Sequence, residues 1–337
     1  MKNKELNLVV DTYGCPNRCL HCWLGHMKNK RMDDNADKFI VDCFSPYFDK
    51  IAYYSWLREP DYCDDYTARW ERDKQISKNT SPERFELASF YRIARDNKYI
   101  PFLKSVGVKK VQLTFFGLKK TQDRYVGRSG AYEEIMSATD KLIDGGIIPR
   151  WQCFINEENK EEIVEVYETA KKIRQTKCPG LEFFVHEGTC DGENRKLYPV
   201  RIEKRNIPQE LLPVYLDCNE LLTEKECCEI LSQDDSNPVF DIGDSITLNI
   251  SNEYGVYYNF THMSKPWIIG NLKADKPDEL VRRVVTGDTY ALNKAKECRW
   301  SELIKYGDNK SEKAFRFDDY KIYLFNEYLD RAYEENI

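Results

Sequence analysis

Residues 8–22 read LVVDTYGCPNRCLHC, an apolar run followed at once by three cysteines. The run from 8 to 12 is apolar and β-branched, which predicts a strand. Cys15, Cys19 and Cys22 then fall in the loop after that strand, in a CxxxCxxC spacing. Working outward from this loop, the chain alternates predicted strands with predicted helices as far as about residue 190. That alternation is typical of a parallel sheet with right-handed crossovers.

The first part of the chain carries six predicted strand–helix units. About 185 residues are too few for a full eight-stranded barrel, which typically needs about 250. The predicted fold class is therefore α/β, a partial (β/α)6 parallel barrel. Residues 61–82 are expected to form a loop with a helical turn, and residues 117–130 a loop. The predicted strands cover 8–12, 50–57, 85–93, 108–116, 147–155 and 181–185, and the helices 37–47, 97–106, 132–144 and 159–174.

The rhythm changes after Gly188, so a boundary is expected near residue 190. Residues 1–190 would form the core barrel, and residues 191–337 a smaller α+β C-terminal extension. In the extension, 246–251 and 256–260 predict a hairpin. Further helices are expected at 277–285, 289–298 and 319–333.

The composition limits the classes of partner that are expected for this protein. The 337 residues are 41% hydrophobic and 32% charged, with a net charge of -6, which indicates an acidic globular protein. Basic residues are dispersed among acidic ones, so no nucleic-acid partner is expected. No apolar run approaches the roughly 18 residues of a membrane span, so no membrane partner is expected. The N-terminal apolar stretch is too brief for a signal peptide, which predicts a cytoplasmic protein. Twelve cysteines in such a compartment favour metal binding or catalysis over a disulfide framework.

The cysteine loop is the strongest chemical signal. Three thiolates this close together can bind three irons of a [4Fe-4S] cube and leave the fourth iron open. The alternative is a zinc site that adds His21 or His26. The loop follows a strand of a parallel barrel, at the end where such barrels place their chemistry, and this favours the cluster.

This loop resembles the signature of the radical S-adenosylmethionine (SAM) superfamily, and the resemblance covers roughly residues 7–190. It implies one [4Fe-4S] cluster on Cys15, Cys19 and Cys22, whose open iron binds SAM. It also implies that an electron from the cluster cleaves SAM to methionine and a 5'-deoxyadenosyl radical, which abstracts a hydrogen from the substrate. A reductant such as flavodoxin or ferredoxin would supply that electron.

A second stretch, Leu57-Arg58-Glu59-Pro60, resembles the family's Gly-Gly-Glu-Pro motif. The resemblance implies that Glu59 binds the SAM amino group, an anion facing an ammonium. Arg58 stands where the family prefers glycine, so the backbone there is expected to differ. The alternative is a surface pair between Arg58 and Glu59.

A third stretch, the predicted strand 108–116 and its exit, resembles another part of the family. The resemblance assigns Thr114 to the SAM ribose and Arg128 or Arg124 to the SAM carboxylate. Phe116 stands where many relatives have aspartate. The alternative is that Thr114 is only a β-former and Arg128 is only solvated.

Three weaker assignments complete the cofactor site. His21 precedes the last cysteine, where the family places an apolar or aromatic residue near the adenine. Gln152 and Asn156, on and after the predicted strand 147–155, match positions of polar SAM or substrate contacts.

The C-terminal part resembles the SPASM or twitch extension of radical SAM enzymes, because Gly270-Asn271-Leu272 follows the hairpin and precedes a helix. That extension usually carries cysteines for auxiliary clusters. Here the cysteines show no CxxC pair, so a degenerate, cluster-free extension is expected, with an auxiliary cluster as the alternative. These cysteines are Cys218, Cys227, Cys228 and Cys298.

The sequence is compatible with three functions. The first is a radical SAM enzyme for a small molecule, such as a carbohydrate or nucleotide, by epimerisation, dehydrogenation or elimination. Cys63, Cys153 and Cys190 are candidates to return a hydrogen to a product radical, although each also fits an inert core cysteine. The second is modification of a ribosomally made peptide, which the SPASM-like extension favours. The third is a non-enzymatic zinc or iron-sulfur protein, which the separate matches at Glu59 and Thr114 disfavour.

Overall fold

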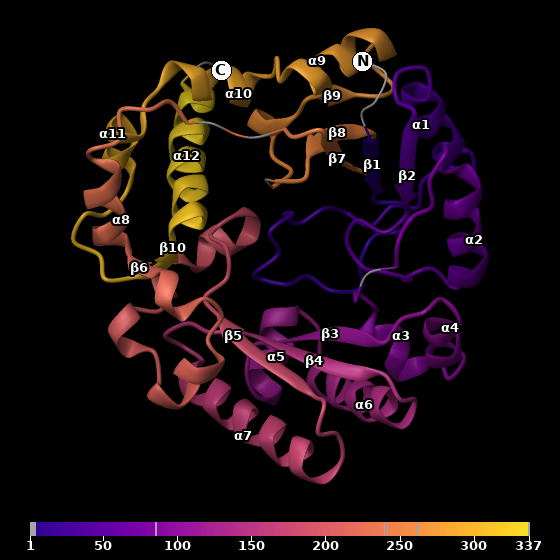
Figure 1. The fold of residues 1–337 in the computed structure, drawn as a ribbon, viewed down its shortest axis with the longest axis vertical. Helices are drawn as coiled ribbons and strands as arrows, with labels where there is room; N and C mark the ends of the chain where they lie inside the picture. The colour runs from indigo at the N-terminus through magenta and orange to yellow at the C-terminus, as the bar shows by residue number, and fades with distance from the viewer. Residues whose placement is uncertain (1–4, 85, 239, 241, 261, 336–337) are drawn as a thin grey trace.

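The computed structural model describes residues 5–84, 86–238, 240, 242–260 and 262–335. Two sheets carry its parallel strands, and in Figure 1 β1 and β7 lie above β3, β4 and β5. The indigo loop after β1 runs between the two sheets. The strands are β1 (Glu5–Val10), β2 (Lys50–Tyr54), β3 (Lys110–Phe115), β4 (Ile148–Phe154), β5 (Glu182–His186), β6 (Leu221–Thr223), β7 (Ser245–Ile250), β8 (Gly255–Tyr258), β9 (Gly270–Asn271) and β10 (Ala314–Arg316).

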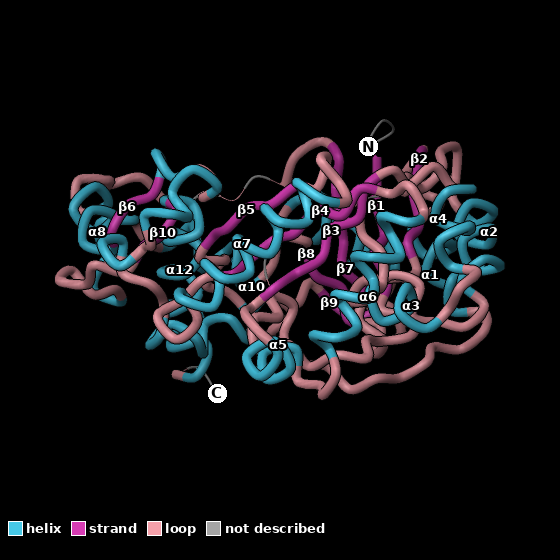
Figure 2. Tube along the Cα trace, turned by 90° about the horizontal axis from the view of Figure 1, so that it is seen from below, coloured by secondary structure: helices cyan, strands magenta, loops and turns pink. Residues whose placement is uncertain are grey.

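Figure 2 shows α8 with β6 and β10 at the end of the molecule opposite α2. Short 3-10 turns fill much of the segment between 192 and 220. The helices are α1 (Ala36–Phe44), α2 (Tyr66–Ile76), α3 (Phe90–Arg95), α4 (Tyr99–Ser105), α5 (Lys119–Val126), α6 (Ala131–Asp144), α7 (Lys160–Thr176), α8 (Glu224–Leu231), α9 (Pro277–Thr286), α10 (Tyr290–Glu297), α11 (Trp300–Leu303) and α12 (Phe317–Glu334).

The sheet β3–β4–β5 is parallel throughout and separates an apolar face from a polar one. Leu113 and Trp151 are buried among side chains of α6 and α7. Residues of alternate parity, such as Gln112 and Gln152, point to the opposite face, because side chains alternate along a strand. The face of this sheet that points away from α6 and α7 is therefore lined mainly by polar side chains.

The α/β fold with parallel strands is confirmed, but the expected third strand over 85–93 is wrong. Phe85 lies outside the described residues, and no strand is present from 86 to 93. Ser89 instead caps α3, since its side chain accepts a hydrogen bond from the backbone N–H of Arg92. This segment still has a backbone hydrogen bond to the neighbouring strand β3, from Gln112 N to Glu86 O at 2.8 Å.

Two segments expected as loops contain helices. The segment 61–82 holds α2, of 11 residues, and the segment 117–130 holds α5, of 8 residues. Helix α5 ends at Gly127, whose φ of 73° is the left-handed geometry that favours glycine after a helix.

The hairpin expected at 246–251 and 256–260 is confirmed as β7 and β8. Strand β7 also pairs in parallel with β1, so the sheet order is β2-β1-β7-β8-β9. Leu8 and Leu248 are opposite each other in this pairing and share one core. Residues beyond 190 thus extend the N-terminal sheet, and the division into two units at residue 190 stays a prediction.

Among the described residues, no helix combines the length and the apolar content that a membrane crossing requires.

Candidate active site

A cavity of about 560 Å³ opens at the carboxyl ends of the parallel strands. Seven of the residues predicted from the sequence line it, and they come from four separate parts of the chain. These are Cys15, Cys19, His21, Cys22, Glu59, Thr114 and Gln152.

Backbone hydrogen bonds attach the cysteine loop to the rest of the molecule on two sides. Arg18 N donates to Val126 O at 2.9 Å, and Leu20 N donates to Tyr125 O at 2.8 Å, which attaches the loop to α5. On the other side, Glu193 N donates to the carbonyl of Cys22 at 2.8 Å. Both the barrel and the C-terminal part of the chain therefore hold the loop.

The three thiols are partly exposed, and all three line the cavity. Burial raises the pKa of the Cys15 and Cys22 thiols and raises the pKa of Cys19 to about 12. A metal cluster would reverse this, because its positive irons stabilise thiolates. Among the described residues, no three His, Cys, Asp or Glu side chains are arranged around a single ion. The thiolates of a cube bind three different irons, so a cluster does not need that arrangement.

Glu59 reaches the thiols from the segment after β2. Its Oε2 lies 4.0 Å from Cys15 Sγ, and its Oε1 accepts a hydrogen bond from Ser89 Oγ at 2.5 Å. Burial raises the pKa of Glu59 to about 7, against the opposing effects of Ser89 and Arg128. Arg58 pairs with Asp11 and not with Glu59, so the alternative of a surface Arg58–Glu59 pair is wrong.

His21 lies against two aromatic rings. Its centroid is 4.3 Å from that of Phe116 and 4.7 Å from that of Phe154. Burial lowers the pKa of His21 to about 3, so the ring is neutral at physiological pH. Within the described part of the chain, its buried Nδ1 has no hydrogen-bond partner. The ring therefore offers both a stacking surface and an unused polar atom.

The polar wall of the cavity extends beyond the predicted residues. Thr114 and Gln152 are register partners on β3 and β4. Gln112 donates to Gln152, whose Nε2 lies 2.5 Å from Nε2 of His186. Gln112 and His186 were missed by the sequence analysis. Strand alternation could have found Gln112, which lies two positions before Thr114 on the same face.

Three predicted cofactor residues lie outside the cavity. Arg128 contacts its wall, because Arg128 Nε donates to Asn17 Oδ1 at 3.1 Å. Arg124 forms a half-exposed ion pair with Glu158 at 2.7 Å. Asn156 donates to Tyr125 OH at 2.7 Å and lines a much smaller cavity that His21 also borders.

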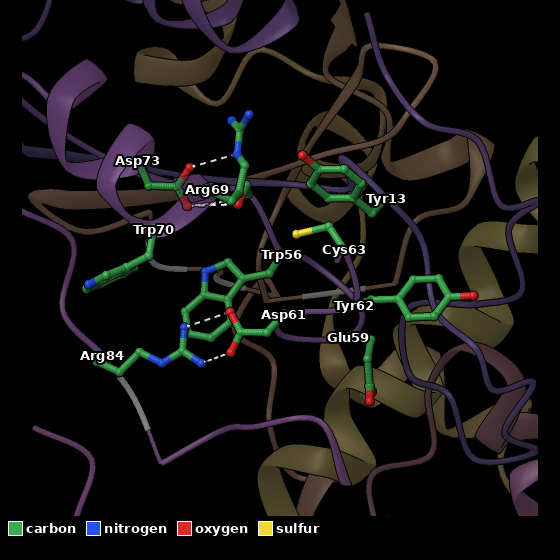
Figure 3. A pocket seen from close by; sticks show the side chains of 11 residues that line it. Tyr13, Trp56, Glu59, Asp61, Tyr62, Cys63, Arg69, Trp70, Asp73 and Arg84 are labelled. Atoms are coloured by element: carbon green, nitrogen blue, oxygen red, sulfur yellow. Dashed lines mark hydrogen bonds and ion pairs between the residues drawn. The ribbon is translucent and has the colours of Figure 1, made fainter. Parts of the chain in front are cut away.

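None of the candidate hydrogen-donor cysteines is among the described residues that line the cavity. Cys63 lies beside Tyr13, in the neighbouring pocket drawn in Figure 3. Cys153 is on the helix-covered face of β4 and is fully buried. Cys190 is buried in the core, although its neighbour Thr189 lines the cavity. Burial raises the pKa of all three thiols.

The cysteines of the C-terminal part are scattered. Cys227 and Cys228 of α8 are buried, and Cys228 Sγ lies 2.9 Å from Tyr320 OH. Cys298 is buried beyond α10, and Cys218 is partly exposed. All four are free thiols.

No protein-family model and no curated protein matches this chain. Its fold does match solved structures of the radical SAM enzyme anSMEcpe. Native anSMEcpe with bound AdoMet (SAM) has a TM-score of 0.50 and 15% identity, covering 98% of each chain. Native anSMEcpe with bound AdoMet and the Cp18Cys peptide has a TM-score of 0.52 and 15% identity, covering 98% of this chain and 97% of that one. The chain therefore shares its fold with radical SAM enzymes.

Proposed function

We propose that this protein is a radical SAM enzyme with one [4Fe-4S] cluster on Cys15, Cys19 and Cys22. The observation that carries the proposal is the meeting of these three thiols with Glu59 at one cavity, although Glu59 comes from a different part of the chain. When bound, the reduced cluster supplies the electron that splits SAM into methionine and a 5'-deoxyadenosyl radical, which removes a hydrogen atom from the substrate. A flavodoxin or ferredoxin type of reductant would be the electron source.

In this proposal, different residues of the cavity bind different groups of SAM. Glu59 accepts hydrogen bonds from the SAM ammonium, and its desolvated position strengthens that pairing. Thr114 binds the ribose, and the His21 ring stacks on the adenine. Arg128 is preferred over Arg124 for the SAM carboxylate, because its guanidinium bonds to Asn17 in the cavity wall.

Gln152 belongs to the same cofactor and substrate wall. Asn156 has a weaker claim, since its amide is occupied by Tyr125 and faces the smaller cavity. Cys63, Cys153 and Cys190 do not line this cavity. Any of them could return a hydrogen to a product radical only after the chain rearranges around the substrate.

The substrate we propose is a side chain of a peptide. The anSMEcpe structure with the Cp18Cys peptide, which has the same fold, supports this class. The rim of the cavity supports it too, because Trp23 is 40% exposed and Leu87 is 46% exposed there. Exposed apolar side chains at a cavity mouth are typical of a binding surface for a larger partner. The SPASM-like extension is a further argument for this class.

A small-molecule substrate, such as a carbohydrate or nucleotide, is the second candidate. The uncharged polar wall formed by Gln112, Gln152 and His186 favours it, since such groups bind hydroxyl-rich ligands. The reaction subclass of either candidate remains a choice among epimerisation, dehydrogenation and elimination.

Anaerobic reconstitution tests the class. The protein is loaded with iron and sulfide, mixed with SAM and dithionite, and assayed for 5'-deoxyadenosine. Cys22→Ala should abolish the nucleoside, and Cys178→Ala, a partly exposed cysteine outside the cavity, should not. About four irons per chain would agree with one cluster, and about eight with an auxiliary cluster. Bound zinc with no nucleoside from any variant would overturn the proposal.

A further inference from the structure

Arg58 occupies the position where the resemblance leads one to expect glycine, and its guanidinium is almost completely buried. The Arg58 side chain is 7% exposed and that of Asp11 is 1% exposed. Arg58 Nε donates to Asp11 Oδ1 at 2.9 Å, and the Nη2 atom donates to Asp11 Oδ2 at 2.8 Å. This two-bond fork satisfies both buried charges at the end of β1.

The same guanidinium also bonds to the segment after the third cysteine. Arg58 Nη1 donates to the carbonyl of Met27 at 2.9 Å, and Nη2 donates to that of Lys28 at 3.4 Å. Asn252, in the turn between β7 and β8, adds a bond from its Nδ2 to the Lys28 carbonyl at 2.8 Å. Residues 23–33 form no helix or strand, and these side-chain bonds hold the segment together with a few backbone bonds, such as that from Met32 N to Thr12 O.

The first cysteine is held in the same way. Asn29 Nδ2 donates to the carbonyl of Cys15 at 2.8 Å, and Cys15 N donates to Asn29 Oδ1 at 3.1 Å. Gly14, with φ of 94°, leaves room for this arrangement, because a Cβ there would lie 2.9 Å from Arg58 Nη2. Asn29 directly follows the two carbonyls that Arg58 binds, so the segment held by Arg58 in turn holds Cys15.

We propose that Arg58 is a positioning residue that holds the cysteine loop in its cluster-binding shape. It does so by joining the end of β1 to the segment that follows Cys22. The inference rests on the proposed function, since it assumes a cluster on this loop. Arg58 also lines the cavity, but its guanidinium acts through Asp11 and two backbone carbonyls.

The test compares Arg58→Gln and Arg58→Lys with a matched control, Arg283→Gln. Arg283 also joins one carboxylate and one carbonyl, at 2.6 Å to Asp275 and 2.7 Å to Ile269, and its side chain is 20% exposed. It lies on α9 and has no bond to the cysteine loop. Each variant is reconstituted anaerobically, and iron release to a chelator is timed. The EPR spectrum of the reduced cluster is recorded with and without SAM, and circular dichroism checks folding.

Arg58→Gln should release iron about tenfold faster than the wild type, the usual scale for losing a group that orients metal ligands. Its EPR spectrum should also broaden or shift. Arg58→Lys should fall between, because an ammonium keeps the charge but cannot form the fork. Arg283→Gln should match the wild type.

Equal iron release from Arg58→Gln and Arg283→Gln would overturn the inference. If Arg58→Gln does not fold, Arg58→Lys carries the test, and wild-type release and spectrum in that variant would overturn it equally. A wild-type protein that never holds a four-iron cluster would refute the proposed function itself, which is a separate result.

Discussion

The Arg84 guanidinium forms two hydrogen bonds with the Asp61 carboxylate, two residues beyond Glu59 (Figure 3). Asp61 has φ of 54°, in the left-handed region that few residues other than glycine adopt. The Tyr99 hydroxyl donates to the same carboxylate, and Arg84 lies 4.4 Å from the ring centroid of Trp56. An unfavourable backbone conformation persists only when its surroundings enforce it, and here Arg84 and Tyr99 hold the Asp61 carboxylate.

Asp61→Ala should therefore destabilise the protein by about 3 kcal/mol, because it leaves a buried guanidinium unpaired. It should also weaken SAM binding, because the backbone two residues after Glu59 is no longer held by Arg84 and Tyr99 and the Glu59 side chain becomes less well positioned. Urea unfolding and SAM titration would measure the two effects. Asp288→Ala removes a half-exposed partner of Arg282 and should cost less than about 1 kcal/mol. Equal losses from the two variants would show that the Asp61–Arg84 pair has no special structural role.

His21→Phe separates the two properties of the His21 ring. Phenylalanine keeps the tilted ring contacts with Phe116 and Phe154 but removes the buried Nδ1, which has no partner among the described residues. Without SAM the variant should be as stable as the wild type, or more stable by about 1 kcal/mol. Its SAM dissociation constant should rise about tenfold if Nδ1 bonds to the bound nucleoside. Thermal unfolding and equilibrium binding measure these quantities, and an unchanged dissociation constant would leave His21 with a stacking role alone.

The sequence predicted the parts of the fold that depend on local pattern. Alternating strands and helices and the CxxxCxxC loop were sufficient for the α/β class, because each element carries its own periodicity. The run from 85 to 93 failed because a short apolar segment fits a strand or a helix equally well. Ser89 decided the outcome by capping α3.

The pairing of β7 with β1 was not predictable in the same way. The two strands are about 240 residues apart, and neither carries a local signal for its partner, although Asn7 and Thr247 are hydrogen-bonded across the pair. The candidate site also combines features that follow from local sequence with features that depend on the folded chain. Cys15, Cys19 and Cys22 were located by spacing, whereas the bonds from Arg58 to Asp11 required the folded chain.

The reactivity of Cys153 tests which face of β4 its side chain points to. Its thiol lies on the helix-covered face of β4 and is fully buried, which raises its pKa. In the native protein it should react with an alkylating reagent at least about a hundredfold more slowly than the partly exposed Cys178 and Cys218, because reaction requires local unfolding. Mass spectrometry of timed alkylation reactions measures the ratio. Labelling of Cys153 at the rate of Cys178 would show that its thiol is accessible, as a hydrogen donor to a product radical must be.

Asp37 predicts a dependence of stability on pH. Its side chain is 2% exposed and joins α1 to α2, through Arg72 Nε at 2.8 Å and Arg69 Nη2 at 3.2 Å. Burial alone would raise the pKa of Asp37, but the hydrogen bonds from Arg72 and the Lys38 backbone N–H and the charge of Arg69 together lower it below its ordinary value of 3.8. A lowered carboxyl pKa stabilises the folded state above the unfolded pKa, and this stabilisation is lost as the pH falls through the folded pKa.

Asp37→Asn should therefore cost about 3 kcal/mol at pH 7, and the cost should shrink as the pH falls below about 4. Urea unfolding of both proteins at pH 7 and pH 3.5, at matched iron content, measures the difference. Asp42→Asn is the control, because Asp42 forms an exposed pair with Lys38 on the same helix and should cost less than about 1 kcal/mol. A cost for Asp37→Asn that does not change with pH would mean that packing, and not the charge of Asp37, joins the two helices.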